Sequence, residues 1–96
     1  MDKASVDKIS SYIGLAQRAG AVLYGEDMIE DKHKSAKLLL IDSAASEKYS
    51  LRLQKKFCVL PIFIVEGLRE ALHRENVNAV ALTNENLANT IIDILR

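Results

Sequence analysis

The most restrictive feature of this 96-residue chain is a continuous apolar run, LLLI, from Leu38 to Ile41. A strand with solvent on one face alternates apolar and polar residues, whereas a strand that is covered on both faces is apolar throughout. We therefore expect this run to form a central strand of a sheet, ended by Asp42 and Ser43. Other elements must then pack on both of its faces.

Three further β-type runs are separated from this one by segments with helical periodicity. We expect these strands at Ala21–Tyr24, Val59–Val65 and Ala79–Leu82. The strand that ends at Val65 is expected to be buried, and Pro61 is tolerable only near its start or on a sheet edge, because proline lacks a backbone N–H. Strands that alternate with helices along the whole chain indicate an α/β fold, a three-layer sandwich.

The first helix is expected to begin near Ser5 as its N-cap and to end at Gly20, which can adopt the left-handed conformation that closes helices. Its inward stripe, with steps of three and four residues, consists of Val6, Ile9, Ile13 and Ala16. The second helix, from Glu26 to about Ser35, is polar and should be a short, largely solvated surface helix. Its apolar anchors are Met28, Ile29 and Ala36.

Three more helices are expected in the rest of the chain. Ser46 can cap the third, Gly67 to Arg74 forms a short fourth, and Thr83 or Asn84 can cap the last. The residues of the third helix expected to face inward are Ala45, Tyr49, Leu53 and Phe57. The inward residues of the last two helices are Leu68, Ala71, Leu72, Leu87, Ala88, Ile91 and Leu95.

Composition limits the size and the charge of the molecule. With 96 residues and 49% apolar content, the chain suits one domain over residues 1–96. Its formal net charge is zero, so any binding to nucleic acid must come from a local patch. The single cysteine, Cys58, has apolar neighbours that predict a core or near-core thiol and fit a reducing, cytoplasmic location. No apolar run is long enough to cross a bilayer.

The residues that most often support catalysis do not form a known pattern. His33 and His73 have no cysteine or carboxylate at the spacing of metal ligands or of a catalytic triad. Cys58 has no sign of activation as a nucleophile. We therefore expect a non-enzymatic protein without a cofactor, in which the two histidines are solvated surface residues.

Four carboxylates are grouped in the second helix, at Glu26, Asp27, Glu30 and Asp31. They could hold a hard cation, but Mg²⁺ and Ca²⁺ sites usually take oxygens from loops as well. The favoured interpretation is that acids in the first turns of a helix are stabilised by its dipole.

The basic residues are also grouped. One set follows the acidic turn and the other lies along the third helix: Lys32, Lys34, Lys37, Lys48, Arg52, Lys55 and Lys56. Such runs are usually solvated faces, although they can also contact RNA. Tyr24 is the one aromatic residue near the turn that could stack on a base.

Several segments resemble the ribosomal L-seven-Ae/L-thirty-e family, in particular its small bacterial YlxQ-type members. The most specific is KISSYIGLAQRAGAVLYGE, from Lys8 to Glu26. The segments AKLLLIDSAAS (36–46), LPIFIV (60–65) and ALHRENVNAVALTNENLA (71–88) match the order of the family's later elements. The resemblance implies a three-layer αβα sandwich with a mixed four-stranded sheet, and proteins of this family commonly bind kinked or looped RNA.

In the family, RNA is held by the start of the second helix, after a glycine that Gly25 matches. Free N–H groups and the positive dipole end at such a helix start suit phosphate. Kink-turn binders carry the pattern G-x-N-E-x-x-K there, where this chain has Asp27, Met28 and Asp31. An ionised aspartate only accepts hydrogen bonds, and Asp31 replaces a lysine that would attract phosphate. Gly25, Glu26 and Asp27 instead approximate the G-E-E of the small bacterial members.

The resemblance implies a second RNA contact in the loop from Arg74 to Asn78. It thus implies a ribosome-associated accessory protein that binds structured RNA in a manner divergent from standard kink-turn recognition, without a membrane or a small-molecule substrate. The expected RNA-binding residues are Gly25, Glu26, Asp27, Asp31, Lys32, Lys34, Arg74, Asn76 and Asn78. Ribosome-associated proteins are further expected partners. The alternative is a protein-interaction domain on the same fold that has lost RNA binding, which the zero net charge and the acidic turn favour.

Overall fold

Four short strands form one mixed sheet in the computed structural model, which describes residues 3–96, with side chains from Asp7 onward. The strands are β1 (Val22–Tyr24), β2 (Leu38–Asp42), β3 (Ile62–Val65) and β4 (Ala79–Leu82). Their order across the sheet is β1-β4-β2-β3. Strand β4 is antiparallel to both β1 and β2, whereas β3 is parallel to β2. The mixed sheet agrees with the expectation.

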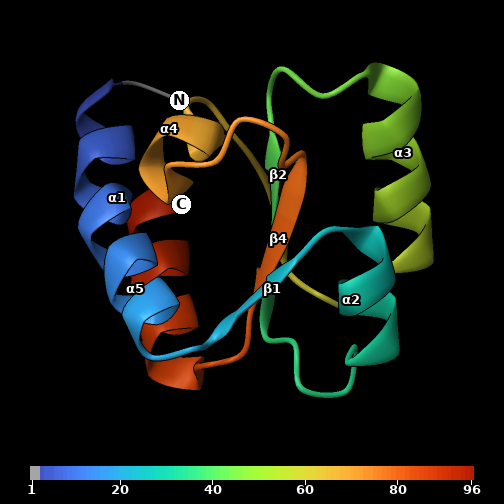
Figure 1. Cartoon of the computed structure of the whole chain (residues 1–96), viewed down its shortest axis with the longest axis horizontal. Coiled ribbons are helices and arrows are strands. Elements are labelled where there is room, and N and C mark those ends of the chain that lie inside the picture. Colours follow the sequence, from blue (N-terminus) through green and yellow to red (C-terminus); the bar gives the residue numbers. More distant parts are fainter. Residues whose placement is uncertain (1–2) are drawn as a thin grey trace.

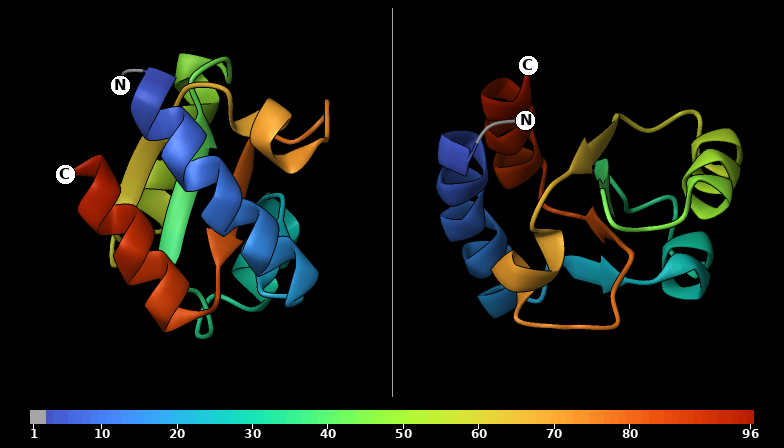
Figure 2. Two further views of the ribbon diagram at one scale, coloured as in Figure 1. Left: turned by 90° about the vertical axis from the view of Figure 1, so that its left-hand side faces the viewer. Right: turned by 90° about the horizontal axis from the view of Figure 1, so that it is seen from above.

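Helices cover both faces of this sheet. In the described part of the chain they are α1 (Lys3–Arg18), α2 (Glu26–Asp31), α3 (Glu47–Lys56), α4 (Leu68–Leu72) and α5 (Glu85–Leu95). Helices α1, α4 and α5 lie on one face, and α2 and α3 lie on the other (Figure 1 and the right-hand view of Figure 2). The fold is therefore a three-layer α/β sandwich, as the alternation of elements predicts.

The central strand β2 explains how the core is divided. Every residue of this strand is buried. Because successive side chains of a strand point to opposite faces, Leu38 and Leu40 join the apolar cluster that contains the buried residues of α1, α4 and α5. Leu39 and Ile41 join the cluster that contains those of α2 and α3. The predicted covered strand is confirmed, and Asp42 belongs to it as a further buried residue.

The end of α1 at Gly20 is confirmed by its backbone. Gly20 has a φ of 68°, in the left-handed region that favours glycine. Its N–H donates to the carbonyl of Gln17 at 3.1 Å, and the N–H of Ala21 donates to the carbonyl of Ala16 at 2.8 Å. This pair of bonds is a Schellman motif, which satisfies the last carbonyls of the helix and turns the chain into β1.

Ser46 and Asn84 cap α3 and α5, as predicted. The Ser46 Oγ accepts a hydrogen bond from the N–H of Tyr49 at 3.2 Å, and the Asn84 Oδ1 accepts one from the N–H of Leu87 at 2.9 Å. The inward faces agree as well. Buried apolar side chains at the predicted positions of the last three helices, including the C-cap of α3, are Leu53, Phe57, Leu68, Ala71, Leu72, Ala88 and Ile91.

The beginning of α1 differs from the prediction. The helix already starts at Lys3, so Ser5 lies inside it and is not its N-cap. The predicted inward side chain of Val6 lies outside the described side chains, whereas the later members of the stripe, Ile9 and Ile13, are fully buried. None of the described helices is both long and apolar enough to cross a membrane.

Helix α2 is shorter than predicted, since it ends at Asp31 and residues 32–35 form turns. Ile29 is fully buried and Ala36 is buried, but 43% of Met28 is exposed, so its predicted role as an anchor is wrong. With 3.6 residues per turn, a helix this short presents few positions to the sheet. Ile29 is its buried residue.

Strand β3 differs most from the prediction. It begins at Ile62, directly after Pro61, and lies at the edge of the sheet beside β2. Half of Ile64 is exposed, as is 87% of Val59, and Cys58 is exposed too. The predictions of a buried strand and of a near-core thiol are therefore wrong. Ile64 lines a hollow beside α3, and an apolar run looks the same in sequence whether or not a helix fully covers that face of the strand.

Candidate nucleic-acid interface

The start of α2 and the loop before β4 meet at one end of the sheet. Strands β1 and β4 are antiparallel neighbours, so the end of β1 lies beside the start of β4. The N–H of Gly25 extends this pairing by donating to the carbonyl of Ala79 at 3.1 Å. The two regions that the family resemblance implies as RNA contacts are therefore adjacent. We call residues 24–27 and 73–78 together the candidate surface.

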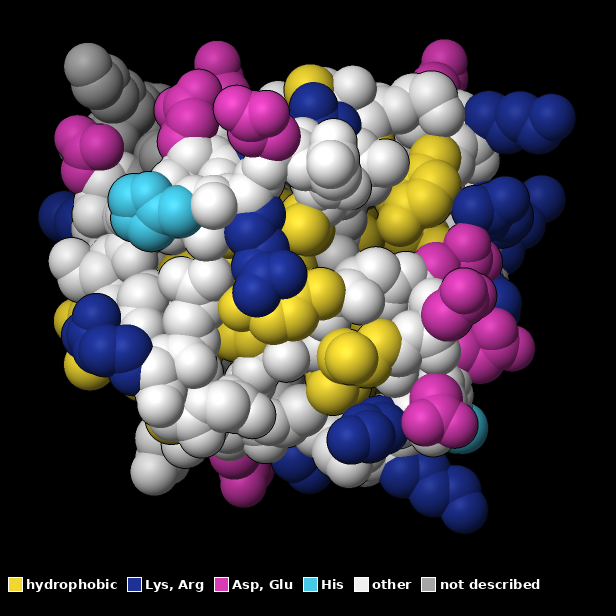
Figure 3. All heavy atoms as spheres, in the orientation of Figure 1, with side chains coloured by type: hydrophobic (Ala, Val, Ile, Leu, Met, Phe, Trp, Pro, Cys, Tyr) yellow, Lys and Arg dark blue, Asp and Glu magenta, His cyan; other side chains and the backbone are white. Residues whose placement is uncertain are grey.

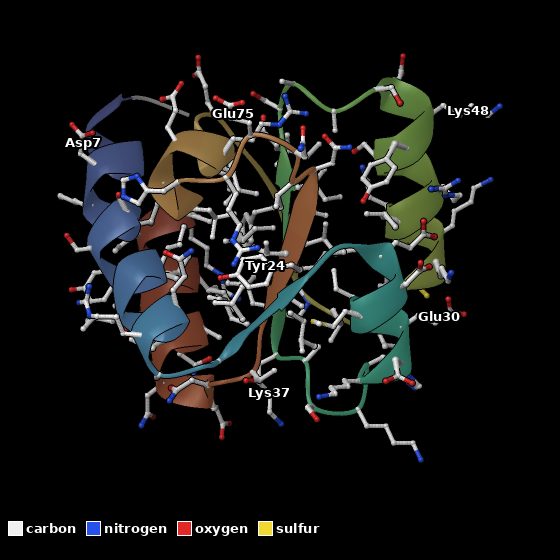
Figure 4. The ribbon with its side chains drawn as sticks, viewed as in Figure 1. Asp7, Tyr24, Glu30, Lys37, Lys48 and Glu75 are labelled. Atoms are coloured by element: carbon white, nitrogen blue, oxygen red, sulfur yellow. The ribbon has the colours of Figure 1, made fainter. Side chains whose placement is uncertain are left out.

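Tyr24 and Arg74 stack on each other in this surface. Tyr24 lies near the middle of the view in Figure 4. The guanidinium carbon of Arg74 is 4.0 Å from the centroid of its ring, a cation–π contact. The Tyr24 hydroxyl accepts a hydrogen bond from the Gln17 Nε2 at 3.1 Å, and the same nitrogen donates to the carbonyl of Leu72 at 2.9 Å. The ring is thus held from α1 and covered by an exposed arginine.

Arg69 anchors the second half of the loop. Its Nε donates to the carbonyl of Val77 at 3.1 Å, and its Nη2 donates to the Oδ1 of Asn78. Its backbone N–H donates to the Oδ2 of Asp42 at 3.1 Å, and this buried carboxylate also accepts from the N–H of Ala44 at 2.8 Å. The side chain of Asn78 is therefore fixed through its oxygen, which leaves its NH₂ group to contact a ligand.

Gly25 shapes the entry into α2. Its φ of 83° and ψ of 161° are disfavoured for residues with a side chain. A Cβ built at this position would have no atom within 4 Å, so the requirement for glycine comes from the backbone and not from crowding. Gly25 supplies no side-chain cap, and the first N–H groups of a helix have no acceptor within the helix.

Two of the four acidic residues of α2 are paired with α3. The Glu26 carboxylate contacts the Arg52 Nη2 at 2.7 Å and the Lys56 Nζ at 3.1 Å, and Glu30 contacts the same lysine at 2.8 Å. Hydrogen bonds to Glu30 and Glu26 raise the pKa of Lys56. These pairs reduce the negative field of α2, and they also occupy two of the basic residues of α3 that were candidates for RNA contact.

The other predicted residues of α2 and of the turns after it are exposed: Asp27, Asp31, Lys32 and Lys34. Among the described residues, neither of the two aspartates has a salt-bridge partner. Both lysines follow the C-terminal end of α2, whereas Gly25 precedes its start. The structure therefore does not place them beside the loop that holds Arg74 and Asn76.

Charged side chains are unevenly spread over the face that carries the candidate surface. In the view of Figure 3, aspartate and glutamate side chains gather toward the rim, while hydrophobic side chains and a lysine or arginine side chain occupy the middle. Glu75 is one of the rim residues, at the upper edge in the matching view of Figure 4. An anionic ligand could approach the middle of this face with less repulsion than the number of acids suggests.

Sequence reasoning missed the residues that hold the candidate surface together, namely Gln17, Asp42 and Arg69. Gln17 contacts residues 7 and 55 positions away, and Arg69 contacts an aspartate 27 positions away. No local pattern marks such pairs. Among the described residues, no group of three or more His, Cys, Asp or Glu side chains comes together in a way that could hold a metal ion.

Comparison with known proteins bears on the fold alone. No family model matches the chain, and no curated protein matches it either. Solved structures with a similar fold include a protein of unknown function from Bacillus halodurans, with a TM-score of 0.83 and 20% sequence identity. The match covers 92% of this chain and 96% of that one. The chain therefore shares its α/β fold with a protein of unknown function.

Proposed function

We propose that this protein binds structured RNA through the candidate surface, without catalysing a reaction. It would act as a ribosome-associated accessory protein of the ribosomal L-seven-Ae-like family that diverges from standard kink-turn recognition. The resemblance of residues 8–26 to that family motivates the proposal. The observation that carries it is the stack of Arg74 on Tyr24 next to Gly25, where the two regions implied as RNA contacts come together.

The stack offers a platform for an unpaired base. RNA readers commonly stack splayed bases on aromatic rings or on the plane of a guanidinium. Arg74 covers the ring of Tyr24, so an incoming base would stack on the outer face of the Arg74 guanidinium. The exposed Asn76 and the NH₂ group of Asn78 could then contact the edge of that base.

The start of α2 would meet phosphate. Gly25, which precedes α2 and follows Tyr24 of the platform, is held at the start of β4 by the hydrogen bond from its N–H to the carbonyl of Ala79. Glu26, the acid closest to this turn in sequence, is drawn toward Arg52 on α3. Asp27 and Asp31 remain without a salt-bridge partner among the described residues, which is why we propose a mode of binding that differs from the family's lysine-containing pattern.

Fluorescence anisotropy with a kink-turn RNA and an unrelated hairpin, each over a range of salt concentrations, tests the proposal. We expect binding that weakens steeply with salt, because phosphate contacts release counterions. Arg74→Ala should weaken binding by about 5- to 150-fold, which corresponds to the roughly 1–3 kcal/mol of one stacked base. Arg74→Lys keeps the charge but loses the planar stack, so it should recover only part of this loss.

Lys48→Gln is the matched control, since Lys48 is an exposed cation near the start of α3, away from Tyr24 (Figure 4). The RNA affinity of this variant should stay within about twofold of that of the original protein, because salt screens an exposed charge that does not contact a phosphate. No affinity for either RNA at low salt would refute the proposal, and equal losses for Lys48→Gln and Arg74→Ala would refute the site.

A second candidate function is protein interaction at the edge strand β3. Leu51 and Ile64 are each 50% exposed and line the same hollow, of about 310 Å³, between α3 and β3. Sheet edges with exposed apolar residues are common sites of association. A pull-down after nuclease treatment tests this role. A partner that survives digestion and is released by Ile64→Lys supports it, whereas a partner that is lost on digestion supports RNA binding instead.

A further inference from the structure

The candidate surface continues into two hollows that share His73. The first, of about 670 Å³, is lined by residues of the loop and of α4, including Arg69, Arg74 and Glu75. The second, of about 560 Å³, lies between α1 and the end of α4. His73 lines both hollows, so the hollow beside the Arg74 platform and the hollow against α1 adjoin at this residue.

The second hollow is rich in hydrogen-bond donors. The residues of α1 that line it are Ser10, Ser11, Gly14, Leu15, Gln17 and Arg18, and the serine, glutamine and arginine side chains among them can donate hydrogen bonds. A Cβ at Gly14 would lie 3.6 Å from the Arg18 Nη1, so the arginine folds back along the helix over the glycine. None of the residues that line this hollow is an aspartate or a glutamate.

The backbone conformation of His73 sets the direction in which the chain leaves α4. His73 is the C-cap of α4, with a φ of 56° and a ψ of 38°, and among the described residues it is the one non-glycine residue with a positive φ. This left-handed conformation is uncommon for a residue with a side chain. It ends α4 so that two consecutive residues take different places, His73 between the hollows and Arg74 over Tyr24.

We infer that the hollow between α1 and α4 is a phosphate subsite for the RNA strand that continues from the base on Arg74. Arg18 supplies the charge, and His73, Ser10 and Ser11 supply hydrogen bonds to the phosphate oxygens. An arginine beside small hydroxyl residues, with no carboxylate in the lining, suits a phosphodiester. This inference rests on the proposed RNA binding and extends it to α1, which the resemblance does not implicate.

Salt titrations of RNA affinity with two substitutions test the inference. Arg18→Gln should weaken binding of the kink-turn RNA and reduce the slope of log affinity against log salt by about 0.7 to 0.9, the value for one lost phosphate contact. Gly14→Glu would place a carboxylate in the hollow, where its Cβ meets only the flexible end of Arg18. It should weaken binding by more than the neutral Gly14→Gln, which fills the same space.

Thermal unfolding of each variant checks that the fold is retained. We expect it to be retained in the Gly14 variants, because a Cβ at this position would meet only the end of the Arg18 side chain. A reduced slope for Arg18→Gln together with weaker binding of Gly14→Glu than of Gly14→Gln supports the subsite. If the original protein binds RNA in an Arg74-dependent manner while Arg18→Gln and Gly14→Glu leave affinity and slope unchanged, the subsite is refuted and the proposed function stands. Absence of RNA binding by the original protein would overturn both.

Discussion

The carboxylate of Glu26 lies 2.7 Å from the guanidinium of Arg52, which is 26 residues later in the chain. This contact joins the first residue of α2 to the middle of α3, and Lys56 strengthens it by contacting both Glu26 and Glu30. In sequence, four acids within residues 26–31 oppose RNA binding at α2. In the fold, half of them face cations, and the surface left for a ligand is less negative.

The pairing predicts that basic residues outside the candidate surface affect RNA binding. In a double variant with Arg52→Gln and Lys56→Gln, the carboxylates of Glu26 and Glu30 lose their partners. RNA binding should therefore weaken, because a freed carboxylate near a phosphate is repelled by roughly 1 kcal/mol in water, which is about fivefold in affinity. The control is the double variant Lys48→Gln with Lys55→Gln, which removes the same charge from the same helix. Equal losses in both variants would show that only net charge matters.

Asp31→Lys should tighten RNA binding. Asp31 is exposed and has no salt-bridge partner among the described residues, so its charge is not compensated locally. Replacing it with a cation adds a contact of the kind that releases counterions, and the salt dependence should become steeper. Asp93→Lys makes the same change on the exposed side of α5. If both substitutions tighten binding equally, α2 is not part of the interface.

Asp42→Ala should destabilise the fold. The buried carboxylate accepts from the N–H groups of Ala44 and Arg69, and each donor left without an acceptor costs about 1–3 kcal/mol. Asp42→Asn keeps one oxygen and should cost less. Urea unfolding measures the difference. Asp93→Ala, at an exposed position, should change the free energy of unfolding by less than about 0.5 kcal/mol. A similarly small effect of Asp42→Ala would show that the network does not stabilise the fold.

Tyr49 should ionise at higher pH than free tyrosine. Burial, followed by the charge of Glu26, raises its pKa above the ordinary value of 10.0, while Arg52 opposes the shift. The unfolded chain then loses this proton first, so the free energy of unfolding should fall as the pH rises above 10.0. Lys56, whose pKa is also raised, acts in the same direction.

Absorbance at the tyrosinate band, in a variant with Tyr12→Phe and Tyr24→Phe, isolates the titration of Tyr49. Glu26→Gln in that background should move the midpoint downward without removing the contribution of burial. A midpoint at or below the ordinary value would contradict the burial of this ring.

The sequence by itself determined the features that depend on neighbouring residues. The run from Leu38 to Ile41 predicted a covered strand, Gly20 predicted a helix end, and Ser46 and Asn84 predicted helix starts. Periodicity, capping bonds and left-handed glycines act over a few residues, so their signals are local.

Only the tertiary structure decided which of the segments became neighbours. Cys58 and Val59 are exposed because they lie in the turn between α3 and β3, and no local pattern separates these apolar turn residues from a buried strand. The contacts of Glu26 with Arg52 and of Arg74 with Tyr24 join residues from different elements. They form because strand order and helix layering bring distant segments together, and the charge and shape of the candidate surface follow from that arrangement.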